Sequence, residues 1–306
     1  MRTTLISMLA LTMALTACGE GGADDGTTIT TAAINTTTVA ATTSVVDVST
    51  TTAAAATEDG PACPDQHFLV VEVNAYEQSG YPDPELAVSC DETTFTVVTN
   101  NIPNFEFVAI TPNDLAAQDL RYEIPLVPTE RDTPGAMGLG AVGVSVSGLN
   151  LFGAFEAPRD GYRDPYLDGL LDFCNGHTAP GGVYHFHARF DCLFDDPTEV
   201  GLVYGYLFDG YEIVSPWVCI DAACTETRMV TSSYVRVDEN ELGAFEAWEY
   251  QEGSGDLDEC NGMTGADGVY RYYATDEFPY LPFCFHGVTT AARGDFDGSA
   301  PQGGTA

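Results

Sequence analysis

A duplicated stretch of sequence restricts the possible folds of this chain more than any other feature. The first copy contains Cys-Asn-Gly at residues 174–176 and the aromatic tetrad Tyr-His-Phe-His at 184–187. The second copy contains Cys-Asn-Gly at 260–262 and Tyr-Arg-Tyr-Tyr at 270–273, with the same interval between the two motifs. The repetition predicts two structurally related units within one folded region.

Histidine distinguishes the two copies. The first copy holds three of the five histidines of the chain, which are His177, His185 and His187. The second copy has replaced each of them, and the corresponding residues are Met263, Arg271 and Tyr273. Chemistry that depends on imidazole is therefore expected in the first copy alone.

The spacing of two of these histidines is typical of a metal-binding strand. Side chains at positions i and i+2 of a strand point to the same face, so His185 and His187 are expected to project together. Two imidazoles at this spacing can bind one transition-metal ion, copper or zinc, because their ring nitrogens can converge on a point. We expect His177 to be the third ligand, since a Cys174–Cys192 bridge would hold its loop near the strand. Weaker candidates for further ligands are Asp172, Asp191 and His286.

Two other interpretations of these histidines remain open. His185 and His187 could be hydrogen-bonded structural residues on a half-buried strand that binds no metal. Alternatively, one of them could act as a general base near neutral pH, with Tyr184 or Tyr270 as the proton donor. An enzyme is the less favoured interpretation, because the chain contains no nucleophile elbow, no His-Glu-x-x-His motif, no phosphate loop and no dinucleotide fingerprint.

The N-terminus has the features of an export signal over residues 1–17. Met1-Arg2 precedes the apolar run Leu5–Leu15, which is too short to span a bilayer as a mature helix. The run ends in Leu-Thr-Ala-Cys at 15–18, which looks like a lipobox, and by that resemblance Cys18 is lipidated. The alternative is an ordinary signal peptide with a chance cysteine. A lipid on Cys18 would anchor an extracytoplasmic protein to a bacterial membrane.

Composition divides the rest of the chain into a tether, a folded region and a tail. Residues 18–60 are rich in Thr and Ala and contain no aromatic residue, so they are predicted to be a disordered tether. Residues 61–290 are long enough for one sizeable domain or for two small, tightly packed ones. Residues 291–306 are predicted to be a flexible tail.

Cysteine usage indicates an oxidising compartment. The chain has nine cysteines, and the eight that remain without Cys18 favour four disulfides. The repeat suggests that Cys174 pairs with Cys192 and Cys260 with Cys284, because both bridges close the same unit. Proximity in the sequence then pairs Cys63 with Cys90 and Cys219 with Cys224. Zinc binding by thiolates is less favoured, since there is no paired Cys-x-x-Cys motif.

The charge of the chain excludes one class of partner. The formal net charge is −36, and all ten basic residues are arginine. A nucleic-acid partner is excluded because phosphate binding needs clustered cations. Direct docking of the domain on anionic lipid is disfavoured for the same reason, so membrane contact is expected through the lipid anchor only. A small molecule, a glycan or a protein remains possible as the partner.

Strand signals dominate the folded region, and the predicted fold class is mainly β: a disulfide-tied, β-rich domain with an internal duplication and long loops. Strands are predicted at 68–73, 93–98, 105–110, 120–127, 141–147, 203–208, 212–214 and 230–237. Asp209-Gly210 predicts a hairpin turn. Short helices are expected at 165–171 and 242–248.

Two further sequence features accompany the copies. Gly-Ala-Phe-Glu-Ala occurs at 153–157 and again at 243–247, each time upstream of a Cys-Asn-Gly, which strengthens the duplication. Seven aromatic residues crowd the end of the second copy: Tyr270, Tyr272, Tyr273, Phe278, Tyr280, Phe283 and Phe285. They are expected to form core packing around a disulfide, and the alternative is a stacking surface for a sugar or a peptide.

These motifs together resemble those of the YHYH domain proteins, a bacterial and mostly exported family. The matching stretches occur in order between Cys90 and Gly287, and they are 99–104, 122–125, 140–144, 172–192, 205–213 and 257–287. The resemblance implies an exported domain and no particular reaction. The family's name motif usually appears twice, whereas the second copy here reads Tyr-Arg-Tyr-Tyr. Phe105 stands where family members often carry a histidine.

The sequence therefore predicts an exported, lipid-anchored YHYH-like domain with a metal site at His177, His185 and His187. The alternative is a non-catalytic module that binds a surface partner or has a structural role, without metal.

Overall fold

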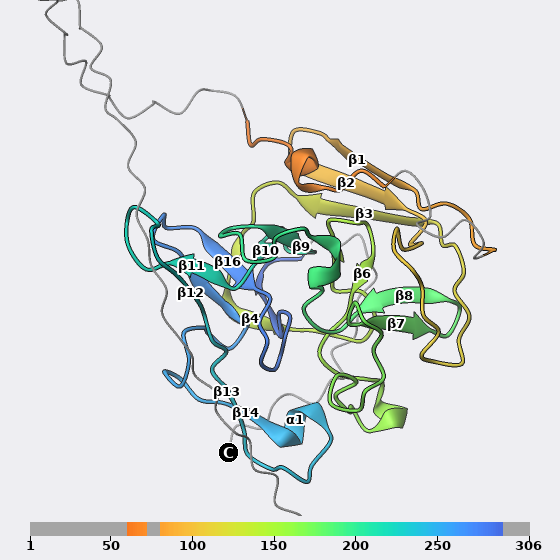
Figure 1. Ribbon diagram of the computed structural model, residues 1–306. Helices are drawn as coiled ribbons and strands as arrows, with labels where there is room; N and C mark the ends of the chain where they lie inside the picture. The colour runs from red at the N-terminus through yellow and green to blue at the C-terminus, as the bar shows by residue number, and fades with distance from the viewer. Residues whose placement is uncertain (1–59, 72–79, 290–306) are drawn as a thin grey trace, which may run out of the picture. The chain divides into compact units, whose positions relative to one another are not determined.

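The computed structural model describes residues 60–71 and 80–289 (Figure 1). The predicted signal peptide, Cys18, nearly all of the tether and the tail lie outside the described residues. Within these described ranges, no helix is long and apolar enough to cross a membrane. The fold is mainly β, as predicted, with long loops between short strands.

An eight-stranded sheet forms the centre of the fold. Its strands lie in the order β15-β16-β10-β9-β5-β6-β8-β7. Their bounds are β5 Gly143–Ser145, β6 Asn150–Leu151, β7 Gly176–Ala179, β8 Val183–Phe186, β9 Val203–Leu207, β10 Glu212–Val214, β15 Gly262–Thr264 and β16 Tyr270–Tyr273.

The two halves of this sheet have the same topology. In the first half an antiparallel hairpin, β5–β6, is followed by the antiparallel pair β7–β8, and β8 runs parallel to β6. In the second half the hairpin β9–β10 is followed by β15–β16, and β16 runs parallel to β10. The duplication in the sequence is thus a duplication of a four-stranded unit, and the two units join where β5 pairs with β9.

Two glycines permit this central pairing. A Cβ atom on Gly143 would lie 2.4 Å from the carbonyl oxygen of Tyr206, and one on Gly205 would lie 2.5 Å from that of Val144. Any side chain at either position would therefore collide with the backbone of the neighbouring strand.

Smaller sheets surround the central one. A three-stranded antiparallel sheet consists of β1 Leu86–Cys90, β2 Thr94–Thr99 and β3 Leu120–Pro125. The two-stranded sheets pair β4 Glu130–Ala136 with β17 Cys284–Gly287, β11 Trp217–Cys219 with β12 Thr227–Met229, and β13 Tyr234–Arg236 with β14 Trp248–Tyr250. In the described part of the chain, the helical elements are α1 Ala244–Ala247 and three 3-10 turns, Pro64–His67, Pro158–Asp160 and Asp191–Leu193.

The two faces of the eight-stranded sheet contribute to different hydrophobic clusters. On one face Leu151, Phe186 and Tyr272 belong to the largest cluster. On the other face Val144 and Tyr206 are buried with Phe95, Val97, Tyr122 and Ile124 of β2 and β3. The three-stranded sheet therefore covers the middle of this second face.

The two Gly-Ala-Phe-Glu-Ala segments pack against each other. The rings of Phe155 and Phe245 have centroids 4.7 Å apart, and both residues belong to a third cluster with Phe278 and Tyr280. Phe278 and Tyr280 are buried, as are Tyr270, Tyr272 and Tyr273. Most of the aromatic residues at the end of the second copy therefore serve as packing, and those five do not form an exposed stacking surface.

The eight cysteines form four disulfides in the pairing expected from the repeat and from proximity in the sequence. They are Cys63–Cys90, Cys174–Cys192, Cys219–Cys224 and Cys260–Cys284. The second and fourth bridges hold equivalent places, since each begins two residues before the outer strand of its unit, β7 or β15.

Several element predictions were wrong. Residues 68–71 of the predicted strand 68–73 form no ladder, although Leu69 donates one backbone hydrogen bond to Val146, and residues 72–73 lie outside the described ranges. Residues 105–110 are also a loop, whose Phe105 packs edge-on against Tyr184. In these two segments Phe68, Leu69, Phe105 and Phe107 pack from a loop against the hydrophobic clusters, whereas Val70, Val108 and Ile110 are exposed. β-Propensity largely measures such side-chain packing and not the backbone pairing itself.

The predicted helix at 165–171 is instead a run of turns. The carboxylate of Asp164 accepts the backbone N–H groups of Tyr166 and Leu167, which offers the chain an alternative to helical bonds. Gly169 then takes the left-handed conformation, with φ of 65°. The helix expected at 242–248 is present over Ala244–Ala247.

Candidate metal centre

A row of side chains crosses one face of the eight-stranded sheet. From one edge to the other, the row reads His177, His185, Asn150, Val144, Tyr206, Glu212, Arg271 and Met263. The three-stranded sheet covers the middle of the row, where Tyr122 donates a hydrogen bond to Asn150. The two ends of the row are equivalent positions in the two copies, and only the first carries histidine.

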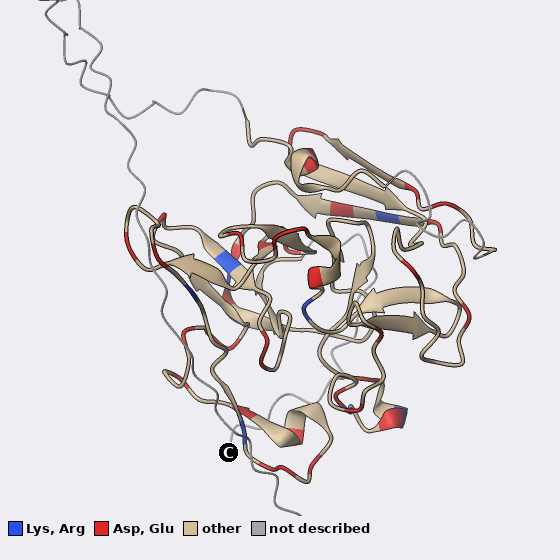
Figure 2. Cartoon of the chain, viewed as in Figure 1, with Lys and Arg blue, Asp and Glu red and all other residues tan. Residues whose placement is uncertain are grey.

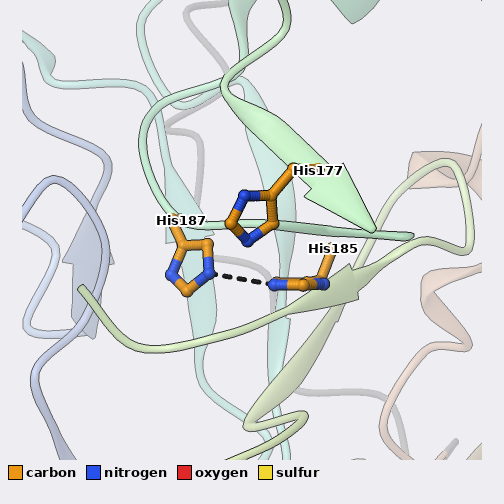
Figure 3. Close-up of side chains that lie close together, drawn as sticks. All are labelled: His177, His185 and His187. Atoms are coloured by element: carbon orange, nitrogen blue, oxygen red, sulfur yellow. Dashed lines mark hydrogen bonds between the residues drawn. The ribbon is translucent and has the colours of Figure 1, made fainter. Parts of the chain in front are cut away.

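The three histidines of the first copy converge (Figure 3). His177 lies on β7, His185 lies opposite it on β8, and His187 follows β8 directly. One nitrogen from each ring lies within 4.8 Å of those of the other two, and all three side chains are buried. The Nε2 atoms of His185 and His187 are 2.9 Å apart. The same-face projection predicted from the His-x-His spacing is therefore present, with His177 beside it.

Backbone carbonyl groups orient all three rings through Nδ1. The carbonyl partners are Leu170 for His177, Val183 for His185 and Gly153 for His187, at 2.8, 3.1 and 2.6 Å. Because a carbonyl oxygen only accepts, these contacts favour the tautomer with the ring proton on Nδ1, which makes Nε2 the ligand atom of each ring. Metal-ligating histidines are held by such outer-shell bonds.

Burial keeps these rings neutral. Burial, followed by the charges of the two neighbouring histidines, lowers the pKa of His185 well below its ordinary value. Burial also lowers the pKa of His177, and it lowers that of His187 to about 3. The Nε2 atoms of the neutral His185 and His187 lie at hydrogen-bond distance, 2.9 Å apart (Figure 3). In a tetrahedral site, zinc–nitrogen bonds of about 2.0–2.1 Å would hold two ligand nitrogens roughly 3.3 Å apart, which is close to this separation.

Glu156 adds a carboxylate that the sequence interpretation missed. Its Oε1 atom lies 3.3 Å from Nε2 of His177, and burial raises the pKa of the carboxyl group. Glu156 belongs to the first Gly-Ala-Phe-Glu-Ala segment, as does Gly153, whose carbonyl orients His187. The repeated pentapeptide was the feature of the sequence that could have pointed to Glu156. In the second segment, Glu246 is exposed to solvent.

The weaker ligand candidates lie elsewhere and have other partners. Asp172 accepts a hydrogen bond from the hydroxyl of Tyr184, on the face of β8 opposite to His185 and His187. The same bond directs the Tyr184 hydroxyl away from these histidines, which argues against Tyr184 as their proton donor.

The other two ligand candidates, Asp191 and His286, also interact with other residues. Asp191 forms an ion pair with Arg189. His286 stacks on Tyr270 in the second copy, with ring centroids 3.6 Å apart. Phe105, at the position where the family often has histidine, packs on the Tyr184 side of β8 as well.

A cavity of about 610 Å³ adjoins the histidines. The ring of Phe152 forms part of its wall and stacks on His185 at a centroid distance of 3.8 Å. The charged part of the lining consists of Glu156, Arg159, Asp160, Arg163 and Asp168. The three buried imidazoles are therefore adjacent to a space that a small molecule could enter.

Comparison with known proteins identifies the scaffold of this site. A family model described as YHYH protein matches residues 121–287, which is more than half of the 306 residues. The matched segment includes both copies of the duplicated unit. No curated protein and no solved structure matches the chain.

Proposed function

The chain belongs to the YHYH protein family, and we propose that its first copy binds one transition-metal ion, zinc or copper, through His177, His185 and His187. The observation that carries the proposal is the convergence of three buried imidazoles, each with its Nδ1 atom against a backbone carbonyl so that its Nε2 atom is the one left for a metal. Uncharged imidazoles are ligands that suit zinc and copper. Because the rings are neutral in the folded protein, binding a cation requires almost no proton release at neutral pH.

Glu156 is the proposed fourth donor. Its Oε1 atom approaches His177 from the cavity side, and its backbone follows the Gly153 carbonyl that orients His187. Three imidazoles and one carboxylate form a four-donor set of the kind that zinc accepts in tetrahedral sites. The partly buried carboxylate would then be neutralised by the metal.

Comparison with the second copy supports a role for the histidines in ligand binding and not in the folding of the unit. It retains the strand pair, the disulfide and the buried tyrosines with Met263, Arg271 and Tyr273 in place of the three histidines. The architecture of the unit therefore does not require imidazoles on this face.

We also propose that the domain is exported and held at the membrane by a lipid on Cys18. The lipobox-like Leu-Thr-Ala-Cys sequence and the four disulfides support this location. Mass spectrometry of the mature protein should find an acylated N-terminal Cys18, and Cys18→Ala should move the protein from the membrane fraction to the soluble fraction. An unmodified mature N-terminus at another residue would contradict the anchor.

Elemental analysis tests the metal site. Purified protein without a polyhistidine tag is dialysed with limiting zinc and copper, beside the His185→Ala/His187→Ala variant. We expect close to one metal ion per chain in the parent protein and a trace in the variant. Equal trace amounts in both proteins would show that these histidines have a structural role.

A matched pair of variants tests the fourth donor. Glu156→Gln should weaken metal binding by about 10- to 100-fold, whereas Glu246→Gln, at the same place in the repeated pentapeptide, should leave it unchanged. Equal affinities for both variants would remove Glu156 from the ligand set while leaving the three histidines in place.

A further inference from the structure

The second copy has a cavity of its own at the opposite end of the row. The cavity measures about 710 Å³, and its lining includes Glu212, Arg271, Met263 and Tyr273. Arg271 and Met263 occupy the positions that His185 and His177 hold in the first copy. The duplicated scaffold thus presents two cavities at the ends of the row, and at the equivalent strand positions one has His177 and His185 and the other has Met263 and Arg271.

The guanidinium group of Arg271 has one nitrogen, Nη2, that could donate a hydrogen bond to a ligand. Its Nε donates to Glu212 at 3.2 Å and its Nη1 donates to Asp267 at 2.9 Å. Nη2 donates to no residue in the described ranges, and the side chain is 25% exposed. Arg228 also lines the cavity, but both of its Nη atoms donate to Asp256. Arg271 is therefore the cation that can take up a ligand oxygen.

Both signs of charge face this cavity beside an apolar wall. Glu212 and Asp267 flank Arg271, and their carboxylates are 29% and 52% exposed. Trp217, Val218 and Met263 belong to the apolar part of the lining. A ligand that fits this arrangement carries an anionic group for Nη2, a cationic group for the carboxylates and an apolar body.

The charge of the whole protein favours a ligand with no net charge. With a formal net charge of −36, the chain repels simple anions at long range. Figure 2 shows Asp and Glu spread over the strands and loops, with only a few basic positions among them. A zwitterion escapes this repulsion and still satisfies both signs of charge in the cavity.

We propose that this second cavity binds a free α-amino acid with an apolar side chain. The carboxylate accepts from Nη2 of Arg271, the ammonium group donates to Glu212 and Asp267, and the side chain packs against Trp217 and Met263. This site is separate from the metal centre and does not depend on it.

Saturation-transfer NMR with the purified protein tests the proposal. The probes are the common L-amino acids, tested singly, and L-leucine is compared with 4-methylpentanoate and isoamylamine, which lack its ammonium and its carboxylate. At least one apolar amino acid should bind saturably and compete with L-leucine, and both truncated analogues should bind at least tenfold more weakly. Absence of saturable binding across the panel, or equal binding of 4-methylpentanoate, would overturn the proposal.

Variants locate the binding in the second copy. Arg271→Gln should weaken it at least tenfold, and Asp267→Asn, on an exposed loop where the change leaves the core intact, should weaken it several-fold. The His185→Ala/His187→Ala variant should bind the amino acid like the parent. Full affinity in both Arg271→Gln and Asp267→Asn would refute the assignment, whatever the outcome of the metal measurements.

Discussion

Asp172 and Asp258 occupy equivalent positions in the two copies, and each makes the same set of hydrogen bonds within its own copy. One carboxylate oxygen of Asp172 accepts the backbone N–H groups of Cys174 and Gly176, at 2.9 and 3.1 Å, and Asp258 accepts the N–H groups of Cys260 and Gly262, both at 2.9 Å. The other oxygen accepts a tyrosine hydroxyl at 2.9 Å, from Tyr184 or Tyr270. Each aspartate therefore ties the Cys-Asn-Gly turn of its unit to the adjacent strand.

Replacing either aspartate should destabilise the protein to a similar extent. Asp172→Ala and Asp258→Ala each leave two backbone N–H groups and a hydroxyl without their acceptor, which should lower the free energy of unfolding by about 2–4 kcal/mol. Only Asp172→Ala should weaken metal binding, because only its turn leads into a strand that carries His177. Denaturant unfolding and metal titration of both variants check this, and a loss of metal in Asp258→Ala alone would contradict it.

The Cys174–Cys192 disulfide should support the metal centre. Removing it with Cys174→Ser/Cys192→Ser should lower the free energy of unfolding by about 3 kcal/mol and weaken metal affinity, because the bridge ties the start of β7 to the chain after β8. The control is Cys219→Ser/Cys224→Ser, whose cysteines are exposed and only 5 residues apart. Calorimetric titration should give the control the affinity of the parent protein; an equal loss in both variants would indicate a global effect.

The junction between the copies should not tolerate a methyl group. Gly143→Ala and Gly205→Ala each place a Cβ atom against the backbone of the facing strand, so each should cost about 3 kcal/mol or more, or prevent folding. Gly60→Ala is the matched control, since a Cβ there meets no atom within 4 Å. Thermal unfolding should separate the first two variants from the control, and a parent-like melting temperature for Gly143→Ala would be incompatible with the pairing of β5 and β9.

Acid should remove the contribution of Asp256 to the free energy of unfolding. Hydrogen bonds from Arg228 and from the Thr231 backbone lower the pKa of this carboxyl from 3.8 to about 2. Because the folded pKa is the lower one, the stabilisation is complete above about pH 4 and is lost as the pH falls toward 2. Asp256→Asn should lower the free energy of unfolding by about 1–2 kcal/mol at pH 7, allowing for the partial exposure of Arg228, and by almost nothing near pH 2. Urea unfolding across this range checks the prediction, which fails if the difference does not change with pH.

Much of the fold and part of the site followed from local sequence. The period of two along a strand was enough to place His185 and His187 on one face. The repeat and proximity in the sequence were enough to pair the cysteines, because both relationships depend on short stretches of chain. The same reasoning failed at 68–71 and 105–110, where Phe68 and Phe105 pack from loops and other apolar residues are exposed. A run of β-branched or aromatic residues looks the same in the sequence whether these residues are buried from a strand or from a loop.

Only the tertiary structure decided what surrounds the histidines. Glu156 and the carbonyl groups of Gly153 and Leu170 come from a loop that the sequence does not relate to β8, so no spacing rule could bring them to the rings. The placement of the two cavities at the ends of one row likewise arises from the pairing of β5 with β9, which joins the copies into one sheet. The sequence by itself determined that the two copies differ in their histidines. The packing of distant segments determined which atoms meet at each end of the row, because non-local contacts are set by the fold as a whole.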